Sequence, residues 1–168
     1  MATKESPTFR EFGENVISER LTKMLSYMRA VRRGEDIEAV HDMRVASRRL
    51  RAALDVFRPA FHGQQFNRFE REIKAVTDAL GEARDLDVMI EHLECLEGII
   101  PRTQRGGIEQ FIEVKRLQRE RCQRDVIRSF ERLDEKDLAA WFQSIVSGKE
   151  VQPDDNSLDN GQHKEGME

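Results

Sequence analysis

The feature that most constrains the fold is a nearly unbroken succession of helical apolar patterns between residues 8 and 152. Proline interrupts helices, and in this stretch it occurs only as Pro59 and Pro101, both at points where an apolar pattern stops. No alternating strand pattern occurs, and no Asn-Gly or Asp-Gly turn separates two apolar segments. The sequence therefore predicts an all-α protein, most simply an antiparallel helical bundle of about four to six helices.

The spacing of apolar residues predicts six helices, over about 8–33, 37–58, 64–80, 86–97, 103–133 and 135–146. Gly81 is expected to break or kink the chain between the third and the fourth. We assign residues 8–147 to one helical bundle. Residues 148–168 are polar and acidic, and we expect them to form a disordered tail.

The distribution of charge matters more than its total. The 168 residues carry a net charge of −4, and residues 149–168 alone, with two basic and six acidic side chains, account for all of it. The other 148 residues have no net charge. Of the 28 basic residues in the whole protein, 21 are Arg. The planar guanidinium suits two-pronged contact with carboxylate or phosphate better than the ammonium of Lys.

A basic stripe runs along the predicted helix 37–58. At about 100° per residue, its members fall within an arc of about 80°: His41, Arg44, Arg48 and Arg51. Apolar residues border the stripe on both sides, namely Val40, Met43, Leu50, Leu54 and Phe57 on one and Val45, Ala52 and Val56 on the other. A solvated helix face is polar across its whole width, so we expect the stripe to lie along a groove or a partly covered seam. Anion binding is the favoured interpretation, and an internal salt-bridge network with Asp42, Asp55, Asp85 or Asp87 is the alternative.

The long helix predicted over 103–133 has a second anomaly. Lys115 and Arg119 fall in the middle of its apolar face. Such cations either extend to solvent along their apolar stems or line an internal polar cavity. With a basic stripe elsewhere in the chain, we favour the cavity. Arg68, Arg71 and Lys74 are interpreted as ordinary surface charges.

Two segments together resemble the CHAD family, the conserved histidine α-helical domain. They are Val40-His41-Asp42-Met43-Arg44-Val45, followed by Arg48-Arg49-Leu50-Arg51, and Leu80-Gly81-Glu82-Ala83-Arg84-Asp85-Leu86-Asp87-Val88. The resemblance covers about residues 12–145. It implies a helical domain that binds inorganic polyphosphate through a basic surface, without catalysis. Family members occur with polyphosphate granules or are fused to triphosphate-tunnel domains, so the resemblance adds targeting to such granules to the cytoplasmic location that the two cysteines favour.

The resemblance assigns the candidate ligand contacts. It carries polyphosphate binding over to His41, Arg44, Arg48, Arg49 and Arg51. Arg84 carries over as a motif residue, with Asp85 orienting an arginine rather than touching the anion. To these the charge anomaly of the long helix adds Lys115 and Arg119.

Family domains usually contain two similar bundles, whereas this chain has one copy of the histidine motif and so resembles half of such a domain. We therefore expect a homodimer in which two basic stripes face each other across a two-fold axis, with the apolar flanks of the stripe as the interface. The acidic tail is hypothesised to compete with the ligand for the basic groove.

Other functions are weighed against this one. One Trp and one Tyr, neither on the basic stripe, provide little for base stacking, so nucleic acid is not the expected ligand. A helical scaffold that binds an acidic protein partner is the first alternative, and a phosphohydrolase using His41 is the second. The four histidines offer no compact pair of ligands on one helix, so we predict no metal and no cofactor. Two cysteines, Cys95 and Cys122, fit a reducing compartment, and no apolar run long enough to cross a membrane exists.

Overall fold

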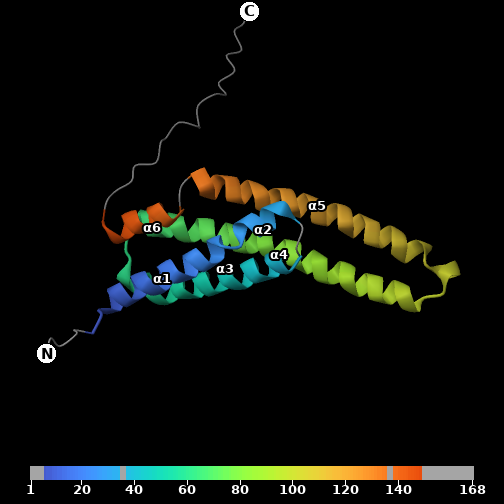
Figure 1. Ribbon diagram of the computed structural model, residues 1–168, viewed down its shortest axis with the longest axis horizontal. Helices are drawn as coiled ribbons and strands as arrows, with labels where there is room; N and C mark the ends of the chain where they lie inside the picture. The colour runs from blue at the N-terminus through green and yellow to red at the C-terminus, as the bar shows by residue number, and fades with distance from the viewer. Residues whose placement is uncertain (1–5, 35–36, 136–137, 149–168) are drawn as a thin grey trace, which may run out of the picture.

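The computed structural model describes residues 6–34, 37–135 and 138–148 of the chain (Figure 1). These residues form α1 (Phe9–Leu25), α2 (Met28–Arg33), α3 (Ile37–Phe57), α4 (Gln64–Ile99), α5 (Gly106–Glu135) and α6 (Leu138–Val146). Short 3-10 turns, η1 (Arg58–Ala60) and η2 (Arg102–Gln104), precede α4 and α5. No strand occurs in the described part of the chain. The all-α helical bundle is confirmed; the acidic tail lies outside the described residues from position 149 onward, and nothing tests its predicted role.

The helices pack in the order α1, α3, α4, α5, each mainly against its neighbour in that series, and α6 bridges α1 and α4 (Figure 1). A capping box starts α1: the Thr8 hydroxyl accepts from the Glu11 backbone, and the Glu11 carboxylate accepts from Thr8. Arg10 ties this end of α1 to the C-terminus of α6, because its Nη2 donates to the Val146 carbonyl at 3.1 Å. These contacts close one end of the bundle.

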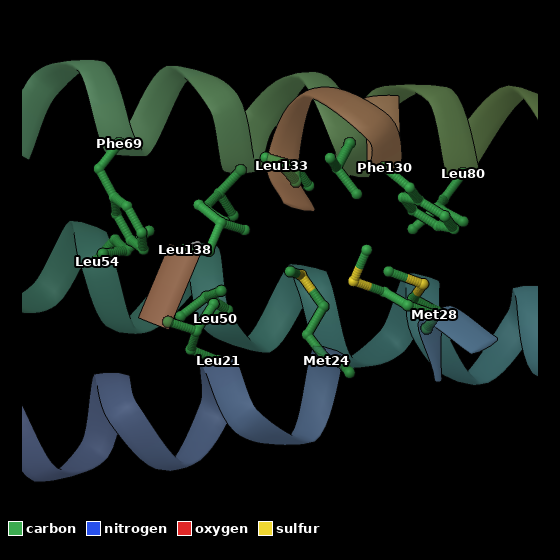
Figure 2. Packing of buried hydrophobic residues seen from close by; sticks show 14 of the residues in the cluster. Leu21, Met24, Met28, Leu50, Leu54, Phe69, Leu80, Phe130, Leu133 and Leu138 are labelled. Atoms are coloured by element: carbon green, nitrogen blue, oxygen red, sulfur yellow. The ribbon is translucent and has the colours of Figure 1, made fainter. Parts of the chain in front are cut away.

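A single apolar core fills the bundle (Figure 2). Every helix contributes side chains that are almost fully buried, among them Leu21, Met24, Met28, Leu50, Leu54, Phe69, Leu80, Phe130, Leu133 and Leu138. The aromatic residues cluster near α6, where Phe142 packs against Phe61 and Phe69. The core therefore lies on the inner side of α3 and α4 and leaves their outer sides to solvent.

Two predicted helix boundaries are wrong. The predicted helix 8–33 is divided at Ser26 and Tyr27, because the Ser26 hydroxyl donates to the Lys23 carbonyl and so competes with the regular helical pattern. The predicted break at Gly81 does not occur: α4 runs through it for 36 residues. Leu80 and Ala83, both 0% exposed, anchor the helix on either side of the glycine, and their packing offsets its low helix propensity.

The far ends of α4 and α5 extend beyond the rest of the bundle (Figure 1). We call residues 88–118 the arm: two helical segments joined through η2. Ile112 is the one residue of the arm that is buried, and it is not part of the bundle core. The arm is therefore a two-helix hairpin that the rest of the chain does not cover.

None of the helices among the described residues is both long enough and apolar enough to cross a membrane.

Candidate anion-binding groove

An open groove of about 810 Å³ runs along the outer side of α4, between α3 and α5. Most of its α4 residues, namely Asp78, Gly81, Glu82, Asp85 and Met89, lie on the side of α4 that faces away from the core. Its floor reaches the core at the buried Thr77 of α4 and the buried Cys122 of α5. Arg44, Arg48 and Arg51 form the α3 wall, as the spacing of the basic stripe predicts. Arg121 faces them from α5. The three arginines of the stripe thus line one depression together, and the binding of an anion there stays a prediction.

Carboxylates balance these arginines. Four arginines and four acidic residues line the groove, the acids being Asp78, Glu82, Asp85 and Asp125. Arg44 Nη2 lies 3.8 Å from Asp85 Oδ1, and Arg51 Nη1 lies 3.6 Å from Asp78 Oδ1. Both distances exceed a normal hydrogen bond, and the two carboxylates are 76% and 60% exposed. Ion pairs of this kind contribute little stability, so these arginines can exchange partners at low cost.

Two groove arginines are unengaged. Among the described residues, neither Arg48 nor Arg121 has an ion-pair or hydrogen-bond partner. The Asp42 and Asp55 carboxylates that the salt-bridge alternative invokes do not pair with the stripe; Asp55 pairs with Arg58 instead. The network is therefore partial, with two long ion pairs and two free guanidinium groups.

His41 and Arg49 lie in a different place from the other motif residues. They line a crevice of about 210 Å³ between α1 and α3, together with Arg20, Lys23 and Asp42. Lys23 Nζ sits 4.8 Å from the centre of the Tyr27 ring. Because the crevice has three cations and one acid, it is the more positive of the two depressions, although it is much smaller. The helix α3 thus presents basic residues into two separate depressions.

Arg84 and Arg119 lie on the opposite face of the α4–α5 pair from the groove. Arg119 Nε donates to Asp87 Oδ1 at 2.7 Å, and its Nη1 donates to Gln123 Oε1 at 2.9 Å. Gln123 in turn donates to the Val31 carbonyl of α2 at 2.7 Å. The Asp87 side chain is 5% exposed and that of Arg119 17%. Arg119 therefore joins α5 to α4 in a buried ion pair, and Asp87 does not face the basic stripe.

Lys115 extends to solvent rather than lining a cavity. Its Nζ donates to Gln118 Oε1 at 3.1 Å and lies 5.1 Å from the centre of the Phe111 ring. Of the apolar residues on the same face of α5, Ile108 is half-buried and Phe111 is 47% exposed. Lys115 therefore lines no internal cavity, because the arm has no core there, whereas Arg119 lies beyond the arm in its buried ion pair with Asp87.

One apolar flank of the basic stripe is not a free surface. Val40, Met43, Leu50, Leu54 and Phe57 belong to the core of the chain, each 5% exposed or less. On the other side Ala52 and Val56 are exposed and do not line the groove. The first flank therefore cannot contribute to the dimer interface that the sequence suggested, and the homodimer itself stays a prediction.

The sequence did not indicate Arg121 as a residue of the groove. Arg71 and Lys74, which the sequence analysis interprets as ordinary surface charges, line a smaller depression that adjoins the groove at Arg51. Their signal was their spacing: Arg71, Lys74, Asp78 and Asp85 recur at intervals of three, four and seven along one face of α4. The basic surface along the α3–α4 seam is thus longer than the motif alone indicates.

The groove also contains a thiol. Cys122 is 8% exposed, and burial, followed by the nearby Glu82 carboxylate, raises the pKa of this thiol. Cys95 is exposed on the arm. Within the described ranges, no group of three His, Cys, Asp or Glu side chains lies close enough together to hold a metal ion.

The fold and the site define a class: an α-helical bundle with an arginine-lined groove of which its histidine-motif helix, α3, forms one wall. The chain belongs to the CHAD family, since the CHAD domain model matches residues 15–163. It is similar to "Uncharacterized protein Rv2226" of Mycobacterium tuberculosis strain H37Rv, with 30% identity over 95 residues, 56% of this chain and 18% of that protein. "Uncharacterized protein MT2285" of strain CDC 1551 matches to the same extent. The chain spans less than a fifth of the length of these relatives. No solved structure matches it.

Proposed function

We propose that the protein binds inorganic polyphosphate in the groove between α3, α4 and α5. The observation that carries the proposal is the row of Arg44, Arg48 and Arg51 along one open groove, with Arg121 opposite. Membership of the CHAD family supports it, because the family resemblance implies this ligand. Arg71 and Lys74 extend the path of the polyanion beyond Arg51.

The groove carboxylates do not prevent anion binding. A polyphosphate chain offers several charges at once, whereas each carboxylate offers one and holds its arginine at 3.6 Å or more. Charge-assisted hydrogen bonds to phosphate oxygens are shorter and stronger than these contacts. Polyphosphate therefore displaces the two carboxylates from Arg44 and Arg51 and also binds the free guanidinium groups of Arg48 and Arg121.

The alternative function, a helical scaffold that binds an acidic protein partner, can be tested by competition binding. An acidic protein would also use the arginines, and its binding would also weaken with salt, but it would have no preference for polyphosphate. The groove lining contains no aromatic residue, which favours a polyanion without bases over a single-stranded nucleic acid.

Binding should fall steeply with ionic strength. Four phosphate contacts predict a slope of about −3 in a plot of log K against log salt, taking about −0.7 per contact as for single-stranded nucleic acid. Fluorescence anisotropy of labelled polyphosphate, titrated with the full chain at several salt concentrations, measures this slope. Heparin, RNA and unlabelled polyphosphate serve as competitors. Equal competition by all three would contradict a polyphosphate site.

The phosphohydrolase alternative is tested in the same samples. Divalent metal is added, and the release of free phosphate is assayed.

The roles of Asp78 and Asp85 give a second prediction. If these carboxylates compete with the ligand, Asp78→Asn/Asp85→Asn should tighten polyphosphate binding roughly fivefold, because two surface ion pairs no longer have to be displaced. If Asp85 orients Arg44, as the family resemblance suggests, the same variant should weaken binding. The contact of 3.8 Å between Arg44 and Asp85 favours tightening. Asp42→Asn, in the crevice between α1 and α3, is the matched control.

A further inference from the structure

The arm carries most of the exposed apolar side chains of the protein. Nine large apolar residues are exposed among those described, and six of them lie in the arm: Met89, Leu96, Ile99, Phe111, Val114 and Leu117. Ile99 is 82% exposed. Single exposed apolar residues need no explanation, but a contiguous group of them indicates a contact surface.

Five of these six residues follow a regular spacing on the two helices of the arm, and only Leu117 lies outside it. With two polar residues at the same spacing they form what we call the outer seam, which comprises Met89, His92, Leu96 and Ile99 on α4 and Phe111, Val114 and Gln118 on α5. Successive members are three or four residues apart, which is the repeat of helices that pack in a bundle. The outer seam continues directly from the groove, since Met89 and Gln118 line both.

A separate seam already joins the two helices of the arm. On α5 it includes Ile108, Ile112, Lys115 and Arg119, again at intervals of four and three. Each helix of the arm therefore has one seam that is used within the chain and a second that is not. Two seams per helix are typical of a four-helix bundle, in which each helix packs against two neighbours.

We propose that the outer seam binds the outer seam of a second copy of this chain, so that two arms form a four-helix bundle across a two-fold axis. A C2 contact uses the same surface on both partners, and a helical hairpin with an unused seam is the partner that this surface fits. The opposite face of the arm is lined by Glu91, Glu94, Arg116 and Glu120 and offers no comparable apolar surface.

Charge favours an antiparallel arrangement of the two arms. Residues 98–108, at the tip, contain Arg102 and Arg105 and no acidic residue. At the base of the outer seam α4 carries Glu82 and Asp85, and the Asp85 side chain is 76% exposed and only 3.8 Å from that of Arg44. An antiparallel arrangement brings the basic tip of each arm to these two carboxylates of the other, where the tip arginines compete with Arg44 for Asp85, while the apolar residues meet between them. A parallel arrangement would place the two basic tips together.

The chain beyond α6 is a poor candidate for covering this surface. Residues 149–168 contain three large apolar residues, Val151, Leu158 and Met167, and eight charged ones. They follow α6, which lies at the end of the molecule away from the tip of the arm (Figure 1). A second arm supplies the spacing and the apolar side chains that this segment lacks.

The size of the surface predicts a weak dimer. From Asp85 to Ile99 the seam is about 21 Å long, and two packed helices are roughly 20 Å wide. Each partner would therefore bury roughly 400 Å². A stable interface of standard size buries about 800 Å² on each partner. We therefore expect dissociation in the micromolar range.

Sedimentation velocity of the full chain, without polyphosphate and from about 1 to about 200 µM, should show a monomer that converts to a dimer. The variant Leu96→Lys/Phe111→Lys should remain monomeric throughout, because it places charged side chains in the apolar part of the contact. The variant Leu96→Gln/Phe111→Gln, which adds no charge, should weaken association at least tenfold. Both residues are about half exposed, so the circular dichroism spectrum and the thermal midpoint should stay as in the parent.

Ala52→Lys/Val56→Lys is the matched control, since it adds the same charge to exposed apolar positions of α3. It should dimerise like the parent. A monomer at all concentrations, an unchanged dimer in the arm variants, or loss of the dimer in the control would each overturn the proposal. Because polyphosphate is absent, none of these outcomes depends on the proposed ligand.

Discussion

Reversing the charge of the three groove arginines, in Arg44→Glu/Arg48→Glu/Arg51→Glu, should weaken polyphosphate binding about 100-fold or more at low salt, since hydrogen bonds to charged groups contribute about 1.5–3 kcal/mol each. The new carboxylates would also repel the ligand across a groove that already contains four acids. Arg48 is exposed, and Arg44 and Arg51 are in part, so the fold should tolerate the change. Anisotropy of labelled polyphosphate gives the affinity, and far-ultraviolet circular dichroism reports the helical content.

The control must carry the same change of charge at another place. Arg29, Arg33 and Arg124 are exposed and line neither the groove nor the crevice that contains His41. A purely long-range electrostatic effect would weaken binding equally in Arg29→Glu/Arg33→Glu/Arg124→Glu. We expect less than a tenth of the loss in this control; equal losses would mean that total charge, and not the groove, governs binding.

His41 and Arg49 can be separated from the groove in the same assay. They line the crevice between α1 and α3 with Arg20 and Lys23. Charge reversal at Arg49 that leaves the affinity intact would confine the ligand to the groove. A loss comparable to that of Arg48→Glu would mean that the chain also reaches the crevice.

The fold was largely predictable because each helix buries one regular face. The positions of α3, α5 and α6 agree with their apolar spacing to within a few residues. Gly81 misled the prediction because a glycine inside a helix costs only about 1 kcal/mol relative to alanine, which burial of Leu80 and Ala83 exceeds. The spacing of apolar residues shows which face of a helix is buried, but not how strongly packing stabilises the helix at a given position.

The site was predictable only in part. The angular arc of the basic stripe correctly placed three arginines on one groove wall, since that depends on α3 alone. Which carboxylate faces them depends on the relative shift of α3 and α4, and so Asp78 was missed while Asp87 was wrongly considered. His41 lies at the edge of the arc and Arg49 outside it, on the side where α1 rather than α4 is the neighbouring helix.

The length of the arm explains the error at Lys115 and Arg119. An apolar stripe on a helix becomes part of a core only where another helix packs over it. The sequence of α5 does not show at which residue the rest of the bundle stops covering its stripe. Cys122 and Val126 are buried in the bundle, whereas Phe111 and Val114 are about half exposed. Lys115 lies on the uncovered side of that boundary and Arg119 close to it.

Replacing Arg119 by Met should reduce the free energy of unfolding by about 3 kcal/mol or more, because a buried carboxylate loses its counter-ion. Asp87 is 5% exposed in its side chain, its Oδ1 receives the Arg119 Nε at 2.7 Å, and its Oδ2 has no hydrogen-bond partner among the described residues. Gln123 also loses the donor that holds it between α5 and α2. Urea denaturation followed by circular dichroism measures the loss.

The double variant Arg119→Met/Asp87→Leu separates the structural role of Arg119 from a role in ligand binding. It removes both charges, so that no buried carboxylate is left without a counter-ion and most of the lost stability should return. If Arg119 holds α5 to α4 without touching the ligand, the stable double variant binds polyphosphate like the parent. If affinity falls at least tenfold although stability is restored, Arg119 contacts the anion and the ligand reaches the face opposite the groove. Arg116→Met/Glu94→Leu removes an exposed ion pair from that same face and should change neither stability nor affinity, because a surface pair of this kind contributes about 1 kcal/mol or less.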